Sequence, residues 1–339
     1  MRAAVCTTPG KIEMREIERP KPKGNQVLVE VNACAICKSD VTGYHGKHPL
    51  MKCPVILGHE CSGVVAEVGP HVTRVKPGQR VAVETFFYVC GECAGCRTGA
   101  YNVCKNVRII GHNAPGAFAE YVLANGDFVF QIPDNVPFEH AALTEPTSVG
   151  VHTIKRCGVK VGDFVVILGL GCIGLFVLQV AKLAGAEVLA ADVQPFKLKM
   201  AKKFGADHIV DASKQDTIAE VMKATGGDGA DVVIDAAGAP QTLKQMVDCA
   251  RSGATLMPIG FTGNDYDEIN MGRITLGEMT LYGILGFCRD FPTSLKLMGR
   301  GRLDAASMIT HHFSLDEVEK GIQTMMDPKS KMIRGIVVP

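Results

Sequence analysis

The chain has 339 residues, with 36 basic and 35 acidic side chains and a formal net charge of +1. Because a single hydrophobic core seldom grows to this size, we expect two domains. Hydrophobic residues make up 47% of the sequence, which excludes global disorder. The balanced charge argues against a nucleic-acid partner, since binding to the phosphate backbone needs a clearly basic face.

Targeting features point to a cytoplasmic protein. Residues 1–31 lack the basic-then-apolar layout of a signal peptide, and no apolar run reaches the ~20 residues needed to cross a bilayer. We therefore expect no membrane partner. The thirteen cysteines then indicate metal ligands or buried thiols before disulfides.

The first ninety residues read as short strands. Apolar and β-branched runs occur at 27–31, 55–57, 63–65 and 80–83, separated by turns rich in glycine and proline. This pattern predicts a small distorted β-barrel.

A cluster of cysteines follows in a glycine-containing loop. Cys90, Cys93, Cys96 and Cys104 have the spacing C-x2-C-x2-C-x7-C. Four thiolates would fill a tetrahedral shell and leave no position for substrate, so the spacing predicts a structural zinc. Redox or disulfide chemistry, or a zinc ribbon that binds nucleic acid, are the alternatives, and the intracellular setting and the few nearby basic residues disfavour them.

The second half of the chain alternates strands and helices. Apolar strands are expected at 163–168, 187–192, 232–235, 254–259 and 279–285, and helices at 172–185, 195–204, 214–225 and 240–251. Such alternation builds a parallel doubly wound sheet. After Asp290, helices at 291–300 and 314–326 and a strand at 335–338 return to the first domain.

A glycine-rich turn joins the first strand and helix of this half. Gly169, Gly171 and Gly174 fit G-x-G-x-x-G, which lets helix N-terminal amides approach a pyrophosphate. Asp192 ends the next strand, where a carboxylate accepts hydrogen bonds from a ribose and repels a 2′-phosphate. The arrangement favours NAD over NADP, and a βαβ unit without a ligand is the alternative.

Four further residues could form an open metal site. Cys37, His59, Glu60 and Glu145 offer one sulfur, one nitrogen and two carboxylates, which suits a zinc that keeps an exchangeable position. Singly, a cysteine or histidine is more often part of a core, and Glu145 could cap a helix.

These motifs together resemble the zinc-containing medium-chain alcohol dehydrogenase family, and within it the polyol and sorbitol dehydrogenase branch. The resemblance spans essentially the whole chain and includes Gly58, His59 and Glu60 with the glycines that follow them, the cysteine cluster and the G-x-G-x-x-G turn. It implies an α/β protein with two domains. These are a GroES-like distorted β-barrel catalytic domain over 1–150, completed by 287–339, and a Rossmann NAD-binding domain with a doubly wound parallel sheet over 151–286.

The resemblance also implies roles near the metal. Cys37 and His59 would bind a catalytic zinc, and Glu60 and Glu145 would exchange with water as ligands. Ser39 would take the proton of the alcohol, and Asp40 would hold His59 in the correct tautomer. Zinc lowers the pKa of a coordinated alcohol, so that hydride can pass to the nicotinamide.

Further cofactor contacts follow from the same resemblance. Lys38 would touch the pyrophosphate and Lys197 the adenosine ribose, and Ile173, Gly260 and Leu285 would line the NAD site. Many relatives carry a relay histidine where this chain has Thr42. The proton route is left open between Thr42 and two nearby histidines, His45 and His48.

The expected function is a zinc-dependent oxidoreductase of carbohydrate metabolism that transfers hydride between NAD and a secondary alcohol of a polyol, sugar or sugar acid. An L-threonine 3-dehydrogenase, a simple alcohol dehydrogenase and a non-catalytic protein that binds NAD and zinc are the alternatives. A sugar acid would need a cation such as Arg108, Arg289, Lys47 or Lys52. The resemblance implies a homodimer or homotetramer paired through the strand at 279–285.

Overall fold

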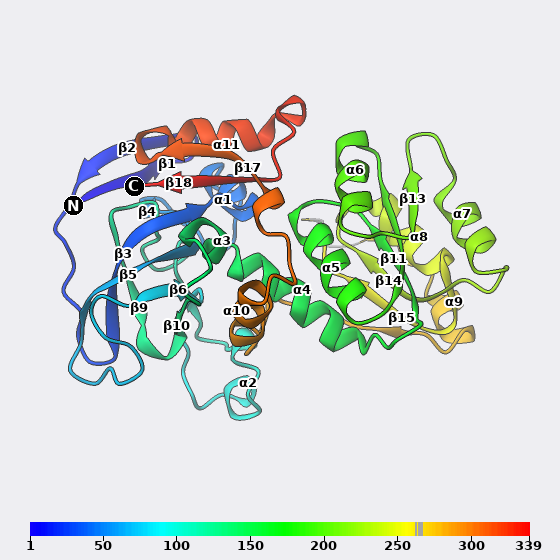
Figure 1. Ribbon diagram of the computed structural model, residues 1–339, viewed down its shortest axis with the longest axis horizontal. Helices are drawn as coiled ribbons and strands as arrows, with labels where there is room; N and C mark the ends of the chain where they lie inside the picture. Colours follow the sequence, from blue (N-terminus) through cyan, green and yellow to red (C-terminus); the bar gives the residue numbers. More distant parts are fainter. Residues whose placement is uncertain (262, 264–266) are drawn as a thin grey trace. The chain divides into compact units, whose positions relative to one another are not determined.

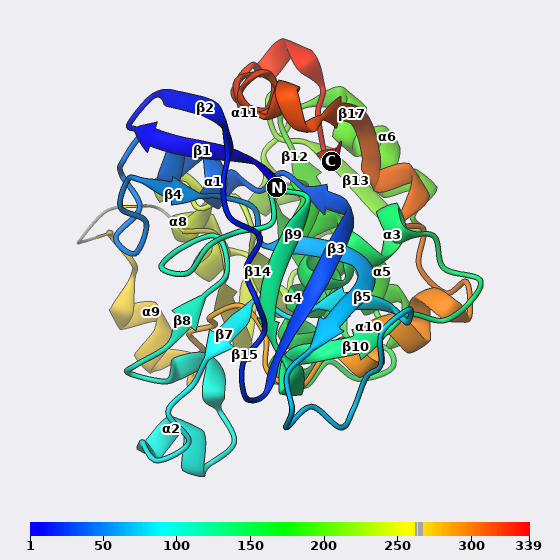
Figure 2. The same cartoon turned by 90° about the vertical axis from the view of Figure 1, so that its left-hand side faces the viewer.

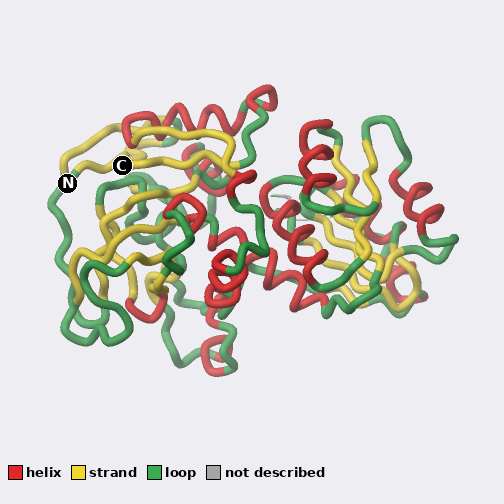
Figure 3. The backbone as a smooth tube through the Cα atoms, in the orientation of Figure 1, coloured by secondary structure: helices red, strands yellow, loops and turns green. Residues whose placement is uncertain are grey.

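The computed structural model describes residues 1–261, 263 and 267–339. The chain forms two compact units: unit 1 comprises Met1–Glu145 and Phe291–Pro339, and unit 2 comprises Pro146–Asp290 (Figure 1). The divisions expected from the sequence lie after residues 150 and 286. Strands and loops make up most of unit 1, whereas unit 2 alternates helices with strands (Figure 3).

Unit 1 is built on a seven-stranded sheet in which β3 pairs with three neighbours. The strand order is β10 (Val129–Gln131), β6 (Arg80–Val83), β5 (Glu60–Val68), β3 (Gln26–Ala35), β18 (Arg334–Val338) and β17 (Ile309–Ser314), with β9 (Tyr121–Asn125) paired to β3. Val27, Val29 and Val31 of β3 point into the core cluster, and Leu28 on the opposite face is also fully buried, as expected for a strand in the middle of a packed sheet.

A second, three-stranded sheet completes this barrel-like core (Figure 2). Its order is β2 (Lys11–Glu16), β1 (Arg2–Thr8) and β4 (Val55–Ile56). Buried Leu57, Ile36 and Phe118 lie in the same hydrophobic cluster as residues of both sheets. The helices of unit 1 outside the cysteine-containing loop include α1 (Lys38–Tyr44), α3 (Phe138–Ala142), α10 (Phe291–Gly299) and α11 (Val318–Met326). The chain returns to this unit after Asp290, as the sequence predicted.

The cysteine cluster occupies a loop-rich extension of unit 1. It runs from β7 (Phe86–Tyr88) through α2 (Ala94–Arg97) to β8 (Arg108–Ile109), and α2 lies away from the sheets in both views (Figures 1 and 2). The two strands pair with each other and close the base of the extension.

Unit 2 contains a six-stranded parallel sheet. Its order is β13 (His208–Asp211), β12 (Glu187–Asp192), β11 (Phe164–Leu168), β14 (Ala230–Asp235), β15 (Ala250–Pro258) and β16 (Thr280–Leu281). The strand order reverses between β11 and β14. In parallel sheets of this kind, ligands bind beside the carboxyl ends of the strands at that switch point.

Helices cover both faces of this sheet. α5 (Cys172–Leu183) and α6 (Pro195–Lys203) lie on one face, and α7 (Thr217–Ala224) and α8 (Pro240–Asp248) lie on the other, with α9 (Met271–Leu276) near them (Figure 1). Right-handed crossovers require this division, because the chain moves outward from β11 to β13 and then returns to β14. The α4 helix (Thr144–Cys157) spans the boundary between the two units.

The expected fold class is confirmed, and several expected element bounds are wrong. The helix expected at 240–251 ends at Asp248, because β15 already begins at Ala250. The strand expected at 279–285 is reduced to β16, and the strands β13 and β17 were not predicted. Among the described residues, no helix combines the length and apolar character needed to cross a membrane.

Candidate active site

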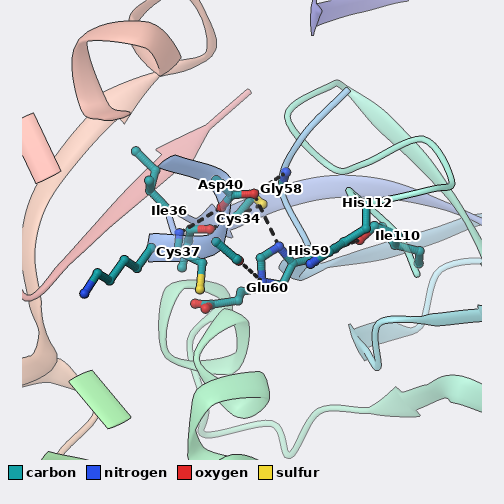
Figure 4. Close-up of polar contacts among 12 residues, drawn as sticks. Cys34, Ile36, Cys37, Asp40, Gly58, His59, Glu60, Ile110 and His112 are labelled. Carbon is teal, nitrogen blue, oxygen red and sulfur yellow. Dashed lines mark hydrogen bonds and ion pairs between the residues drawn. The ribbon is translucent and has the colours of Figure 1, made fainter. Parts of the chain in front are cut away.

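Three segments far apart in sequence meet where β3 ends and where β5 and β18 begin (Figure 4). β3 and β5 are antiparallel, and Ala35 lies opposite Glu60. β18 pairs with the other side of β3, and Ile336 lies opposite Ala35. The pairing therefore brings Cys37, just after β3, close to the start of β5 and the start of β18.

The turn before β5 requires glycine. Gly58 has φ +89°, and a Cβ there would lie 2.8 Å from the Phe118 ring and 2.9 Å from Cys34 Sγ. A larger residue would displace the turn that carries His59. Gly58 also donates its backbone N–H to Asp40 Oδ1 at 3.1 Å.

Asp40 is fully buried and connects α1 to this turn through hydrogen bonds. Its Oδ2 accepts the backbone N–H of Cys37 at 2.8 Å, and its Oδ1 lies 3.3 Å from His59 Nδ1. Burial alone would raise the pKa of Asp40, but the contacts with His59 and with two backbone N–H groups lower it. Asp40 thus lies against His59, and Ser39 Oγ lies 3.4 Å from the other ring nitrogen, Nε2.

Three predicted ligands form one donor set. Cys37 Sγ, a His59 ring nitrogen and a Glu60 carboxylate oxygen all lie within 4.8 Å of one another. Burial opposes the Cys37 thiolate, but the charge of Arg334 and the contact with His59 lower the pKa of Cys37 to about 6. Glu60 Oε2 is buried and has no hydrogen-bond partner in the described part of the chain. A thiolate, an imidazole and a carboxylate fit a zinc ion.

Arg334 is a residue of this site that the sequence analysis missed. It is 4% exposed and donates to Glu60 Oε1 at 2.8 Å and to the backbone oxygen of Ile36 at 3.2 Å. Its guanidinium is also 3.8 Å from Cys37 Sγ. Arg334 therefore links the start of β18 to two members of the donor set.

Glu145 lies outside the three-residue donor set. It sits in the first turn of α4, and the burial of its carboxyl together with the charge of Glu60 raises the pKa of Glu145 to about 8. Its interactions with Glu60 and His59 place it in their neighbourhood. Glu145 is the second residue of α4, and its alternative role as a helix cap stays a prediction.

The residues offered for the proton route have different surroundings. Thr42 Oγ1 donates to the backbone oxygen of Lys38 at 3.1 Å, as threonine often does within a helix. His45 is exposed, with Nε2 2.9 Å from Met326 Sδ. His48 is partly buried and packs against His112, a residue that the sequence analysis did not single out.

The four clustered cysteines converge. The Sγ atoms of Cys90, Cys93, Cys96 and Cys104 lie within 4.8 Å of one another, and none forms a disulfide. The Sγ of Cys90 accepts the backbone N–H of Cys93 at 3.4 Å. Backbone N–H groups of Cys96 and Lys105 lower the pKa of Cys93 to about 6. Four converging sulfurs and thiolate-stabilising amides fit a closed zinc shell.

The glycine-rich turn of unit 2 follows β11 and begins α5. Gly169 has φ +93°, and a Cβ there would lie 2.6 Å from the backbone nitrogen of Ala237. A Cβ on Gly174 would lie 2.0 Å from the backbone oxygen of Gly169. A Cβ on Gly171 would meet no atom within 4 Å, so Gly171 leaves open space at the start of α5. The turn is tightly packed on one side and accessible on the other, as pyrophosphate binding requires.

Asp192 closes the far end of this turn. Its Oδ2 accepts the backbone N–H of Leu170 at 2.7 Å, and its Oδ1 accepts that of Gln194 at 2.9 Å. Lys197 Nζ lies 3.5 Å from Oδ2. The carboxylate is thus held in place at the end of β12, where the lysine offsets part of its charge.

The other predicted cofactor residues have varied environments. Ile173 lies partly buried in the first turn of α5, and Lys38 is exposed at the start of α1. Gly260 donates to the backbone oxygen of Asp235 at 2.9 Å, and Leu285 is 60% exposed. Asp235, which the sequence analysis did not assign, ends β14, and its Oδ1 accepts the N–H of Ala237 at 3.0 Å.

The chain is similar to known dehydrogenases over its whole length. Residues 23–134 match the alcohol dehydrogenase GroES-like domain, and residues 172–300 match the zinc-binding dehydrogenase domain. Sorbitol dehydrogenase of Bacillus subtilis (strain 168) is 34% identical over 345 residues, which cover 100% of this chain and 97% of that protein. The chain belongs to the zinc-type medium-chain dehydrogenase family, polyol branch.

Two further relatives of this dehydrogenase bear on substrate and cofactor. L-threonine 3-dehydrogenase of Pyrococcus furiosus is 35% identical over 94% of this chain and 93% of that protein. A protein from Sinorhizobium meliloti 1021, described as a zinc-binding dehydrogenase and solved bound to NADP, has a TM-score of 0.94 and 34% identity, with coverage of 100% of this chain and 99% of that one. The chain is an oxidoreductase, and its relatives do not share one substrate name.

Proposed function

We propose that this dehydrogenase oxidises a secondary alcohol of a polyol, sugar or sugar acid to a ketone, with NAD as hydride acceptor. The observation that carries the proposal is the donor set of Cys37, His59 and Glu60, whose ligand atoms lie within 4.8 Å of one another. A closed structural site would need a fourth protein ligand, whereas three protein ligands leave a position for the substrate.

Two zinc sites per chain follow from the chemistry of the donors. Cys37, His59 and Glu60 would hold a catalytic zinc, with Glu145 able to replace Glu60 or water, and Cys90, Cys93, Cys96 and Cys104 would hold a structural zinc. When bound at the first site, zinc supplies a positive charge that lowers the pKa of an alcohol hydroxyl. The structural site would fix the fold of the loop between β7 and β8.

The residues around the donor set orient it and handle the proton. Asp40 holds the Nδ1 edge of His59 at 3.3 Å, so that Nε2 faces the hydroxyl of Ser39 at 3.4 Å. Ser39 would take the proton of the alcohol at Oγ and pass it toward solvent. Thr42, whose hydroxyl is three residues further along α1, is the next group in the proposed route.

NAD would bind at the carboxyl end of the unit 2 sheet. The amides at the start of α5 would face the pyrophosphate across Gly171, and Ile173, Gly260 and Leu285 would add apolar and backbone contacts. Asp192 and Lys197 would bind the adenosine ribose, and Lys38 would contact the pyrophosphate. The negative charge of Asp192 favours NAD, although the Sinorhizobium meliloti relative binds NADP.

The proposed assembly is a homodimer or homotetramer. β16 is the edge strand of the unit 2 sheet, and large apolar side chains near it are exposed, with Leu276 at 90% and Leu285 at 60%. Pairing of two edges would cover Leu276 and protect the strand from aggregation, whereas Leu285 is assigned to the proposed NAD site. The thirteen free thiols fit a reducing, cytoplasmic location.

The experiment that tests the proposal is a substrate panel with NAD and the purified, zinc-loaded protein. Hexitols, aldonates, inositols, simple secondary alcohols and L-threonine are compared by the rate of NADH formation. Highest kcat/KM for a polyol, sugar or aldonate supports the proposal. Highest kcat/KM for L-threonine would assign the enzyme to the second candidate, which the Pyrococcus furiosus relative favours. NAD binding without turnover of any member would show a non-catalytic protein.

A further inference from the structure

Three histidine rings of unit 1 form a continuous row of edge-to-face contacts that starts at the donor set. The rings of His59 and His112 have centroids 4.8 Å apart and meet edge to face at 67° (Figure 4). The rings of His112 and His48 are also 4.8 Å apart, at 75°. His48 comes from the loop after α1 and His112 from the turn after β8. The fold therefore places the His112 ring against a proposed metal ligand and the His48 ring against His112.

Backbone contacts fix which nitrogen of His48 and which nitrogen of His112 carries the proton. His48 Nδ1 accepts the N–H of Leu50 at 3.2 Å, so its proton is on Nε2. His112 Nδ1 lies 3.2 Å from the carbonyl oxygen of Ile110, which can only accept, so its proton is on Nδ1. Nε2 of His48 is consequently a donor and Nε2 of His112 an acceptor.

Both rings are neutral in this environment. The His112 ring is only 9% exposed, which disfavours a charged imidazolium, and His48 Nδ1 accepts the N–H of Leu50, which requires a lone pair on that nitrogen. In the part of the chain that the structure describes, Nε2 of His48 and Nε2 of His112 have no hydrogen-bond partner. The adjacent rings thus offer one N–H donor and one lone pair, without a charge.

This combination matches a hydroxyl group better than an anion. An alcohol hydroxyl donates one hydrogen bond and accepts others, so it can satisfy both nitrogens together. A carboxylate or a phosphate only accepts, and the lone pair of His112 would face its negative charge. Arg108, one candidate cation for a sugar acid, packs over the ring of Phe87 and donates to the carbonyl of Asn113.

We propose that His48 and His112 bind a second hydroxyl of the substrate, beside the one that is oxidised, and so select neutral polyols over simple alcohols and sugar acids. The inference rests on the proposed dehydrogenase function and narrows its substrate class. The two histidines are substrate-binding residues, and the oxidation itself does not require them.

The test compares two kcat/KM ratios in single variants of the zinc-loaded enzyme. The first ratio is kcat/KM for the best neutral hexitol or tetritol divided by kcat/KM for butan-2-ol, which has only one hydroxyl. The second ratio is kcat/KM for the same polyol divided by kcat/KM for its aldonate. His48→Phe and His112→Phe keep an aromatic ring and remove the hydrogen bond. His48→Gln keeps an N–H donor, and His71→Phe, at an exposed position elsewhere in unit 1, is the matched control.

Loss of one hydrogen bond to the second hydroxyl should lower the ratio of kcat/KM for the polyol to kcat/KM for butan-2-ol by about tenfold in each Phe variant. KM for the polyol should rise more than kcat falls, and kcat/KM for butan-2-ol should stay within about threefold. His48→Gln should keep most of the wild-type ratio, and His71→Phe all of it. Calorimetric affinity of the NADH complex for the polyol, together with zinc content and melting temperature, separates lost binding from misfolding.

Several results would overturn the inference while leaving the dehydrogenase function standing. One is a wild-type enzyme that prefers the aldonate to the polyol. Others are equal first ratios in the wild type and both Phe variants, or an equal loss in His71→Phe. Failure of the function itself is distinct, because the wild type would then oxidise neither the polyol nor butan-2-ol. If a Phe variant does not fold, His48→Leu and His112→Leu, which also remove the hydrogen bond, take its place. An unchanged polyol to butan-2-ol ratio in those variants would likewise overturn the inference.

Discussion

The charge of Asp192 should determine the choice between NAD and NADP. Asp192→Asn keeps the size of the side chain and removes the negative charge that would face the 2′-phosphate of NADP. Both carboxylate oxygens also accept backbone N–H groups, from Leu170 and Gln194, and an amide can accept only one of them. The variant will therefore weaken the binding of both cofactors, and the informative quantity is the ratio of kcat/KM with NADP to kcat/KM with NAD.

The size of the shift follows from Coulomb's law. Two unit charges 4 Å apart interact by about 1 kcal/mol in water and by about 4 kcal/mol near a protein surface. Asp192 is nearly buried, but Lys197 lies 3.5 Å away and offsets part of its charge. We expect about 2 kcal/mol, which corresponds to a roughly thirtyfold rise in the NADP to NAD ratio.

The control for this variant is Asp211→Asn. Asp211 ends the neighbouring strand β13 in register with Asp192, and its carboxylate contacts Ser213 and Lys214. Its substitution should leave the ratio unchanged. Initial rates over a range of each cofactor at constant ionic strength supply the numbers. A change below about threefold in Asp192→Asn, or an equal change in Asp211→Asn, would refute the role given to the Asp192 charge.

Three further outcomes follow from the structure. Cys93→Ala should reduce the zinc content from two ions to one per chain and expose the β7–β8 extension to proteolysis; retention of both ions would contradict the four-cysteine site. Gly171→Ala should weaken NAD binding without lowering the melting temperature, since its Cβ enters open space, whereas Gly174→Ala should lower both, because its Cβ would lie 2.0 Å from a backbone oxygen. Asp290 is buried against two basic side chains of α4, and these contacts hold its pKa below 3.8 despite the burial. The stability that Asp290 adds is fully present above the pKa of an unfolded aspartate and is lost as the pH falls through the lower pKa of the folded state. The difference in unfolding free energy between the wild type and Asp290→Asn should therefore shrink in acid. A difference that stays constant from pH 7 to pH 3 would contradict this role of Asp290.

Most of the correct predictions from the sequence rest on patterns of neighbouring residues. The spacing of the four cysteines and the register of strand, glycine turn and helix are short-range features, so they can be read from a few adjacent residues. The alternation of strands and helices from 163 onward likewise determines a parallel sheet, because the crossover rule leaves few topologies. The roles of individual residues in binding metal, substrate and NAD stay predictions.

Long-range pairing explains what the sequence could not predict. Arg334 reaches Glu60 only because β18 pairs with β3, which in turn pairs with β5. His112 reaches His59 from a turn between short strands, and no periodic pattern marks it. β16 is short because only Thr280 and Leu281 pair with β15, although the sequence around them is apolar over a longer stretch.

The most direct test of the account is the zinc content and NADH formation of Cys37→Ala measured on one sample. Removing this sulfur should leave one zinc per chain, held by the cysteine cluster, with NAD affinity unchanged and no NADH formed from any alcohol that the wild type oxidises. NADH formation at the wild-type rate by protein with one zinc per chain would contradict the claim that a metal at Cys37, His59 and Glu60 activates the alcohol.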